Sequence, residues 1–228
     1  MRSHCPSSSQ APFARNYPDL DLVGLTKQSR EIRRLFPELG YTEDKMFNAL
    51  NRLRGIGPGV WGRLTYYDLD NKRHVDIFLN RFIMNHKLDL RARLTIDKST
   101  IPLADLLLTK LQIVNIERKD VLDVLAIFKD HSLEATDAPD AINANYIAGI
   151  CSKDWGWWKT VTTNLQKILG WLDDYGLSDD EKEGIEKKMR DIISKINSEP
   201  KSLTWNMRAA IGEKKTWYEY VDTPELRF

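Results

Sequence analysis

The hydrophobic pattern of the chain changes near residue 100. Before that point, short segments alternate apolar and polar residues, which predicts β-strands. Beyond it, apolar residues recur at every third or fourth position, which predicts amphipathic helices. We expect strands at 17–24, 63–68, 72–79 and 88–96, a helix at 26–39 and a short helix opening at 42–44, then helices at 103–113, 118–131, 137–151, 154–175, 178–198 and 203–212.

Strands first and helices after them indicate an α+β fold. We expect a small mixed β-sheet region at 1–100, followed by a helical region at 101–228 that packs on it. Residues 1–16 are rich in Ser and Pro and carry no periodicity, so we expect a flexible tail or an irregular approach to the first strand. Residues 217–220 form an aromatic tail after the last predicted helix.

The first predicted strand, YPDLDLVG at 17–24, carries two acidic residues on one face. Alternate side chains of a strand share a face, so Asp19 and Asp21 point the same way. Two carboxylates held this close are either solvated and without a role, or held together by a cation such as Mg²⁺. Asp-x-Asp alone leaves both interpretations open.

The segments 63–68 and 72–79 form a predicted β-hairpin, with Asp68-Leu-Asp-Asn71 as its turn. In the second strand Asp76 lies among apolar residues, and buried acids need a partner or a metal. One interpretation is an ion pair with an arginine such as Arg63 or Arg81. The other is a metal-binding or catalytic carboxylate.

Composition narrows the class of protein. The chain has 228 residues, of which 42% are hydrophobic and 29% charged, values that are ordinary for a soluble globular protein. A net charge of +1 argues against broad electrostatic binding of duplex DNA. Without a signal peptide or a membrane-spanning run, we expect a cytoplasmic protein with no membrane partner, and with Cys5 and Cys151 reduced. The four histidines show no zinc-ligand spacing with the cysteines.

A competing DNA-binding interpretation rests on Leu53-Arg-Gly-Ile-Gly-Pro58, which resembles the hairpin of a helix-hairpin-helix module. That module needs a second helix directly after its glycines, where turn amides meet a phosphate. The residues that follow, with Val60, Trp61 and a Thr-Tyr-Tyr run, favour a strand instead.

Taken together, the acidic motifs resemble those of the nucleotidyltransferase superfamily, which has the DNA-polymerase-β-like fold. Asp19-Leu-Asp21-Leu-Val is similar to its Asp-x-Asp strand, and His74-Val-Asp76-Ile-Phe to its third-carboxylate strand. Leu106-Leu-Leu-Thr-Lys110-Leu-Gln followed by Arg118-Lys-Asp120-Val-Leu-Asp123 is similar to the signature of the abortive-infection toxin-type branch. The likeness covers roughly residues 15–165.

This resemblance implies metal-dependent transfer of a nucleoside monophosphate from a nucleoside triphosphate to an unidentified acceptor. Asp19, Asp21 and Asp76 would bind Mg²⁺ or Mn²⁺, and Asp76 would also take the acceptor proton. Lys110 and Arg15 would contact the nucleotide; for Lys110 a lysine that merely lies along the surface is the alternative. Asp120 and Asp123 are expected to be structural or to support the site indirectly, paired with Arg118 or Lys119. The tryptophans at 155–158 are expected to pack in a core, with stacking on a nucleotide base as the alternative.

The sequence departs from the family in one place. Members carry a Gly-Gly/Ser or Gly-Ser turn upstream of Asp-x-Asp, which holds the nucleotide phosphates. That turn would fall before His4, and Ser7, Ser8 and Ser9 lack its glycines. We therefore expect activity impaired by N-terminal truncation, with a catalytically inactive protein that binds a nucleotide or a partner as the alternative.

Overall fold

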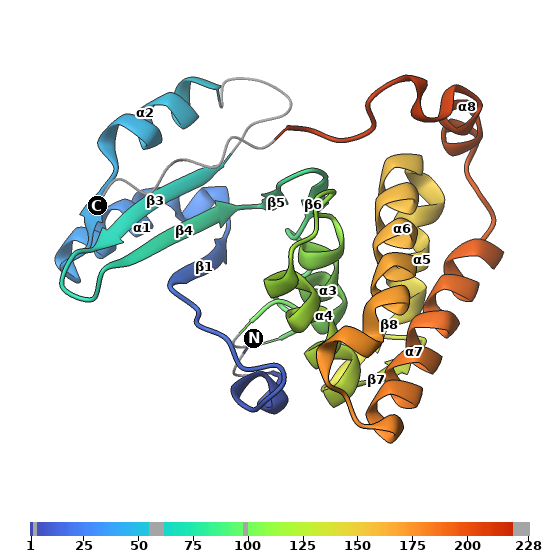
Figure 1. The fold of residues 1–228 in the computed structure, drawn as a ribbon. Helices are drawn as coiled ribbons and strands as arrows, with labels where there is room; N and C mark the ends of the chain where they lie inside the picture. The colour runs from blue at the N-terminus through green and yellow to red at the C-terminus, as the bar shows by residue number, and fades with distance from the viewer. Residues whose placement is uncertain (2–3, 55–61, 98–99, 221–228) are drawn as a thin grey trace. The chain divides into compact units, whose positions relative to one another are not determined.

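The computed structural model describes residues 1, 4–54, 62–97 and 100–220 of the chain. It has the expected α+β composition, with a small mixed sheet and a helical C-terminal half (Figure 1). Contacts divide the described residues into two units. The sheet unit comprises 16–83 and 87–101, and the helical unit comprises the residues up to Arg15, the turn Met84–His86, and the chain from Pro102 onward.

The sheet unit is built on four strands in the order β1-β4-β3-β2. Strand β1 (Asp19–Gly24) runs parallel to β4 (Arg73–Leu79), whereas β3 (Arg63–Asp68) is antiparallel to β4 and to β2 (Thr42–Glu43). The predicted hairpin is confirmed, and its two strands differ from the expected bounds by a single residue. Because β1 enters the sheet beside β4, two strands far apart in sequence become neighbours.

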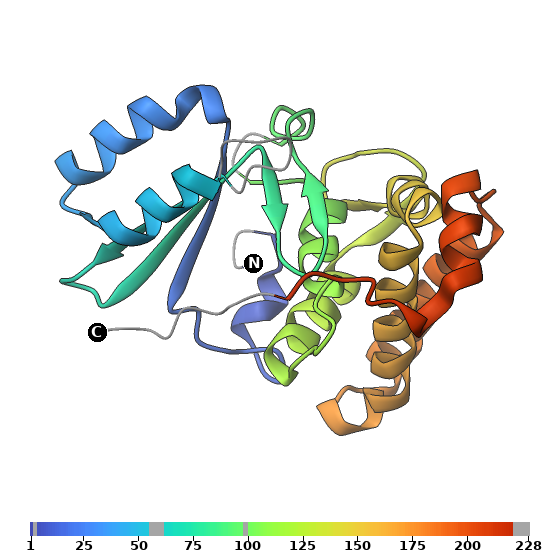
Figure 2. The same ribbon diagram turned by 90° about the horizontal axis from the view of Figure 1, so that it is seen from above.

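Two helices of the sheet unit, α1 and α2, lie beside these strands (Figure 2). After the 3-10 turn η2 (Thr26–Gln28), helix α1 (Ser29–Glu38) packs Ile32 and Phe36 against a core formed by one face of β3 and β4. Gly40 follows α1 with φ +90°, a conformation that favours glycine, and the chain turns there into β2. Helix α2 (Lys45–Arg54) contacts β3. That core consists of Leu64, Tyr66, Val75, Ile77 and Leu79.

The strand expected at 88–96 is much shorter. Only β6 (Lys87–Asp89) forms, paired antiparallel with β5 (Arg81–Ile83). The Asp89 carboxylate accepts a hydrogen bond from the backbone N–H of Arg91 at 3.1 Å, which turns the chain. Local side-chain bonds of this kind compete with strand pairing, so the apolar alternation past Asp89 does not continue the strand.

The helical unit contains the six helices of the second half. They are α3 (Leu103–Leu111), α4 (Arg118–Asp130), α5 (Ala144–Lys153), α6 (Trp155–Trp171), α7 (Asp179–Ser198) and α8 (Leu203–Ile211). Short 3-10 turns, η3 (Leu172–Tyr175) and η4 (Gly212–Lys214), follow α6 and α8, and strands β7 (Ser132–Glu134) and β8 (Ala141–Asn143) pair in parallel. Figure 1 shows α5, α6 and α7 side by side, as their contacts require.

Two helix starts in this unit illustrate how capping sets the boundaries. The predicted Ser178–Glu181 capping box is confirmed by reciprocal hydrogen bonds of 2.9 and 3.3 Å. Helix α5 begins at Ala144 and not near residue 137, because Asn143 ends β8 and its side chain accepts from the N–H of Tyr146 at 2.9 Å.

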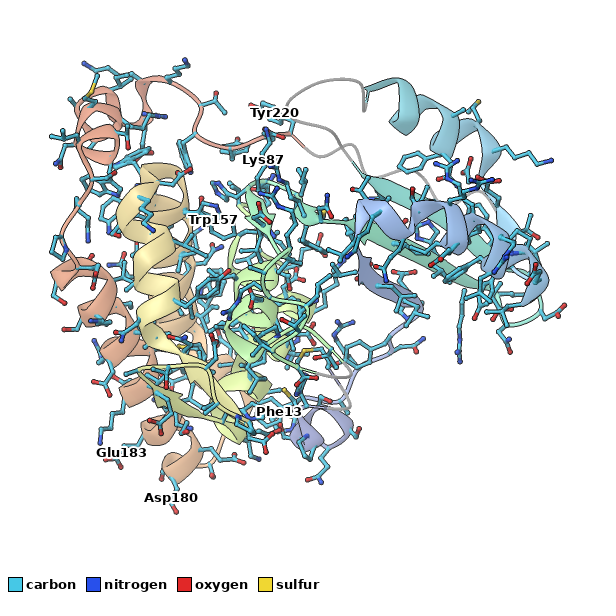
Figure 3. The ribbon with its side chains drawn as sticks, turned by 180° about the vertical axis from the view of Figure 1, so that it is seen from behind. Phe13, Lys87, Trp157, Asp180, Glu183 and Tyr220 are labelled. Atoms are coloured by element: carbon cyan, nitrogen blue, oxygen red, sulfur yellow. The ribbon has the colours of Figure 1, made fainter. Side chains whose placement is uncertain are left out.

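The described residues before β1 approach that strand irregularly, as one of the two expectations has it, but residues 4–15 pack within the helical unit, which corrects the expectation of a flexible tail. Pro6–Ser9 form the 3-10 turn η1, and Phe13, labelled in Figure 3, is buried in the helical unit. Ser7 donates to the Asp130 carboxylate from its backbone N–H at 3.0 Å and its hydroxyl at 2.8 Å. The burial of Phe13 and these charge-assisted bonds hold a segment whose sequence has no periodic pattern.

Both cysteines, Cys5 and Cys151, are buried free thiols. Burial raises the pKa of the Cys5 thiol to about 12, so the thiol stays protonated at neutral pH. None of the helices in the described ranges combines the length and the apolar character needed to cross a membrane.

Candidate functional site

The structure places Asp21 and Asp76 next to each other on the sheet. The parallel pairing of β1 with β4 sets Asp21 opposite Asp76 and Asp19 opposite His74. Residues paired in this way point to the same face, and adjacent strands are about 4.8 Å apart. Asp19 and Asp21 are exposed, whereas Asp76 is 7% exposed. The three predicted acids therefore share one face and differ in solvent access.

Asp76 is held by neighbours through one oxygen. Its Oδ1 accepts a 2.6 Å hydrogen bond from the hydroxyl of Thr65, the residue paired with it on β3. Arg63 Nε is 3.0 Å from the same oxygen. The Nε–H is not aimed at that oxygen, so we treat the contact as an ion pair. Arg63 is the partner that the structural interpretation of Asp76 expects, whereas Arg81 pairs with Asp89 at 3.7 Å.

A histidine and a tyrosine complete this face of the sheet. His74 Nε2 is 3.6 Å from Asp76 Oδ1, and the His74 ring lies 5.4 Å from that of Tyr67. Tyr67 donates its hydroxyl to Asp44 at 2.9 Å. Burial, followed by this hydrogen bond, raises the pKa of Tyr67 to about 12. The face thus carries one imidazole beside three carboxylates, and a phenol that stays protonated at neutral pH.

The donors on this face fit the chemistry of a hard divalent cation, which prefers carboxylate oxygens. All the polar contacts of Asp76 in the described residues go to Oδ1, so Oδ2 is the oxygen with which Asp76 would join Asp21. In the described part of the chain, however, no three His, Cys, Asp or Glu side chains are arranged to hold one metal ion.

Arg15 and Lys110, the predicted nucleotide contacts, both belong to the helical unit and share one carboxylate there. Arg15 binds Asp123 through two nitrogens, with Nε 2.8 Å from Oδ1 and Nη2 2.6 Å from Oδ2. Lys110 Nζ is 3.0 Å from Oδ2. Burial opposes ionisation of Asp123, but the Arg15 hydrogen bond and the Lys110 charge outweigh it and lower the pKa of this carboxyl.

Asp120, the other acid of the segment from Arg118 to Asp123, has a different role. Asp120 is buried at the start of α4, and its carboxylate accepts from the backbone N–H of Glu117 at 3.3 Å. Burial raises its pKa. Asp120 and Asp123 are thus structural, as expected, but the observed ion pairs of Asp123 go to Arg15 and Lys110 and not to Arg118 or Lys119.

Trp155 and Trp157 of α6 pack in a core, as expected, whereas Trp158 is half-buried. Trp155 and Trp157 are 6% and 3% exposed. The guanidinium of Arg208 lies 4.6 Å from the centre of the Trp155 ring, a cation–π contact. Most of the helix-hairpin-helix candidate at 53–58 lies outside the described residues.

Sequence reasoning missed two partners of the acidic face. Thr65 can be found by counting back across the predicted hairpin from its turn, because Asp68 pairs with Arg73 and Thr65 therefore with Asp76. The contact between Tyr67 and His74 follows from the same count. No sequence signal links Ser7 to Asp130, since that contact joins segments 123 residues apart.

Comparisons with protein-family models, with curated proteins and with solved structures found no match to this chain. The function is therefore argued from the residues themselves.

Proposed function

We propose that the sheet unit is a nucleotidyltransferase-like module that binds a nucleoside triphosphate with a divalent cation and transfers its nucleoside monophosphate group to an acceptor. The observation that carries this proposal is the register of the two parallel strands, which sets Asp21 of Asp-x-Asp directly beside Asp76. A register shift by one residue would have put the two carboxylates on opposite faces.

In this proposal the chain's own residues have separate tasks. Asp19 and Asp21, exposed on β1, and Asp76, paired with Asp21 on β4, would hold the cation. The bound cation supplies positive charge at the phosphate that is attacked. Thr65 fixes Oδ1 of Asp76 and so orients this carboxylate. The acceptor gives its proton to Asp76 as it bonds to the phosphorus of the transferred group, and pyrophosphate leaves.

A second candidate function is a catalytically inactive nucleotide- or partner-binding protein. The contacts of Asp76 favour it, because Arg63 and Thr65 already satisfy part of this carboxylate without a cation. A buried ion pair of this kind is sufficient to explain an acid in a sheet. The two candidates differ in whether Asp76 exchanges its arginine for a cation.

The full-length chain tests both candidates in one experiment. Pyrophosphate release is measured with each of the four nucleoside triphosphates and Mn²⁺ or Mg²⁺, and nucleotide binding is measured by the thermal shift of unfolding. Transferase activity predicts release that Asp76→Asn abolishes and Asp19→Ala reduces. The matched control is Asp70→Asn, an exposed acid in the turn between β3 and β4, which should change nothing.

Each outcome decides between the candidates. Release that survives Asp76→Asn at the wild-type rate removes Asp76 from the site. A thermal shift with nucleotide but no release supports the inactive candidate. If the wild-type chain neither binds nucleotide nor releases pyrophosphate under any of these conditions, the nucleotidyltransferase proposal is wrong in both forms.

A further inference from the structure

The last six described residues, 215–220, form an extended strap within the helical unit. They follow α8 and the turn η4, and Figure 2 shows this red segment running back along the unit. Lys215, Thr216 and Tyr220 are exposed, whereas Trp217, Tyr218 and Glu219 are half-buried. Docking of the strap therefore depends on its three central residues.

The backbone of the strap is recognised by a single asparagine. The N–H of Glu219 donates to the Asn85 carbonyl at 2.9 Å, and the Asn85 side-chain amide donates to the Glu219 carbonyl at 2.7 Å. The Asn85 side-chain oxygen also accepts from the N–H of Val114 at 2.9 Å, which fixes its orientation. These contacts are made with the main chain of the strap.

The side chain of Trp217 contacts a hydroxyl group, that of Thr160, and an aromatic ring, that of Trp155. Its indole N–H donates to the hydroxyl of Thr160 at 3.0 Å, and its ring meets Trp155 edge-on at 6.0 Å. The same hydroxyl is 2.8 Å from Nε2 of His86, which lies beside Trp157 of α6. Trp157 and Tyr220 are labelled in Figure 3. A residue without an N–H donor on its ring would leave the Thr160 hydroxyl without this bond.

Gly156 on α6 makes room for the strap. A Cβ atom at this position would lie 2.6 Å from the carbonyl oxygen of Trp217 and 3.3 Å from the His86 ring. The first separation is shorter than real contacts allow, so any side chain here displaces the strap backbone. By contrast, a Cβ atom at Gly170, on the same helix, would meet nothing within 4 Å.

We propose that Gly156, Thr160 and Asn85 form a docking slot for an extended peptide that carries a tryptophan, and that the strap is its resident occupant. The slot binds the indole N–H of a tryptophan and the main chain of the residue two positions later. The segment Trp217-Tyr-Glu219 provides this spacing. The slot should therefore accept the same peptide from solution when Trp217 is removed.

The first test uses hydrogen exchange of the full-length chain. In Gly156→Ala the Glu219 amide should exchange at least tenfold faster than in the wild type, because its bond to Asn85 is lost with the displaced backbone. Gly170→Ala is the matched control and should leave that amide unchanged. Thr160→Val keeps the backbone space at Gly156 and removes the hydroxyl that binds Trp217. It should also accelerate exchange of the Glu219 amide, so two independent variants test the proposal.

The second test supplies the occupant in trans. A labelled peptide of residues 214–220 is titrated into full-length Trp217→Ala, where we expect saturable binding. The same peptide with alanine in place of tryptophan, and the same titration with Thr160→Val added to the protein, should each weaken binding at least tenfold. Unchanged Glu219 exchange in both Gly156→Ala and Thr160→Val, or binding of the two peptides with equal affinity, would overturn the proposal.

Discussion

Asp21 and Asp76 are register partners on two parallel strands, although 55 positions of sequence separate them. Asp76 is buried, and its carboxylate oxygen Oδ1 contacts Nε of Arg63, whereas Asp21 is exposed. The pair therefore has two possible counterions, the arginine already present and a divalent cation. The effect of replacing Arg63 on cation affinity distinguishes a structural ion pair from a cation site.

Replacing Arg63 with Gln should strengthen Mn²⁺ binding if the cation proposal is correct. The guanidinium and the cation compete for the same carboxylate, so removing the guanidinium charge should tighten binding by about tenfold, or about 1.4 kcal/mol. The measurement is Mn²⁺ titration by electron paramagnetic resonance. Arg81→Gln is the control, because Arg81 pairs with Asp89. Equal Mn²⁺ affinity in both variants and the wild type would mean that Arg63 and Mn²⁺ do not compete.

Asp123→Ala should destabilise the helical unit strongly. Asp123 is the shared anion of Arg15 and Lys110, and its removal takes away the buried carboxylate that contacts both cations. Breaking a buried pair in this way costs about 3–5 kcal/mol. Because the pKa of Asp123 is lowered, the stabilisation is present above its ordinary value of 3.8 and is lost as the pH falls below it.

Urea unfolding at pH 7 measures the cost of Asp123→Ala. Glu186→Ala is the control, since Glu186 pairs with Arg190 at an exposed i,i+4 position of α7 and should lose at most about 0.5 kcal/mol. A loss for Asp123→Ala as small as the control's would show that this buried cluster contributes nothing to stability.

Asn48→Ala should weaken the sheet unit. Asn48 is buried on α2, where its side chain accepts from the N–H of Thr65 at 2.8 Å and donates to the Thr65 carbonyl at 3.1 Å. The variant leaves the Thr65 N–H without this partner, at about 1–3 kcal/mol, whereas the Thr65 carbonyl still accepts from the N–H of Asp44 at 3.0 Å. Thermal unfolding compared with Met46→Ala, an exposed position on the same helix, measures the effect. Equal melting temperatures would rule out this role for Asn48.

The helical unit should lose stability in mild acid through His86. Burial lowers the pKa of His86 from 6.5 to about 4, so between these values the unfolded chain takes up a proton and the folded chain does not. The free energy of unfolding should therefore fall by about 3 kcal/mol as the pH drops from 7 to 4.

Comparison with His86→Gln isolates that contribution, since every other group titrates in both proteins. The variant should be less stable than the wild type at pH 7, and the difference should shrink as the pH falls. A difference that stays constant from pH 7 to pH 4 would show that His86 does not take up a proton on unfolding in this range.

Local patterns in the sequence determined the elements of this protein. The hairpin around Asp68-Leu-Asp-Asn71, the capping box at Ser178 and the amphipathic helices were all predictable, because turns, caps and helix faces depend on residues a few positions apart. The same alternation placed Asp19 and Asp21 on one face of a strand, and Asp76 on the face of another strand that lies opposite to Val75 and Ile77.

Tertiary structure decided which of these elements meet. Only the parallel pairing of β1 with β4 brings Asp21 to Asp76, and only the docking of the N-terminal segment carries Arg15 to Asp123. The strap contacts of Asn85 and Glu219 likewise join residues 134 positions apart. Contacts at such separations depend on the burial and hydrogen bonding of the whole unit, and no periodicity within a short window of sequence encodes them.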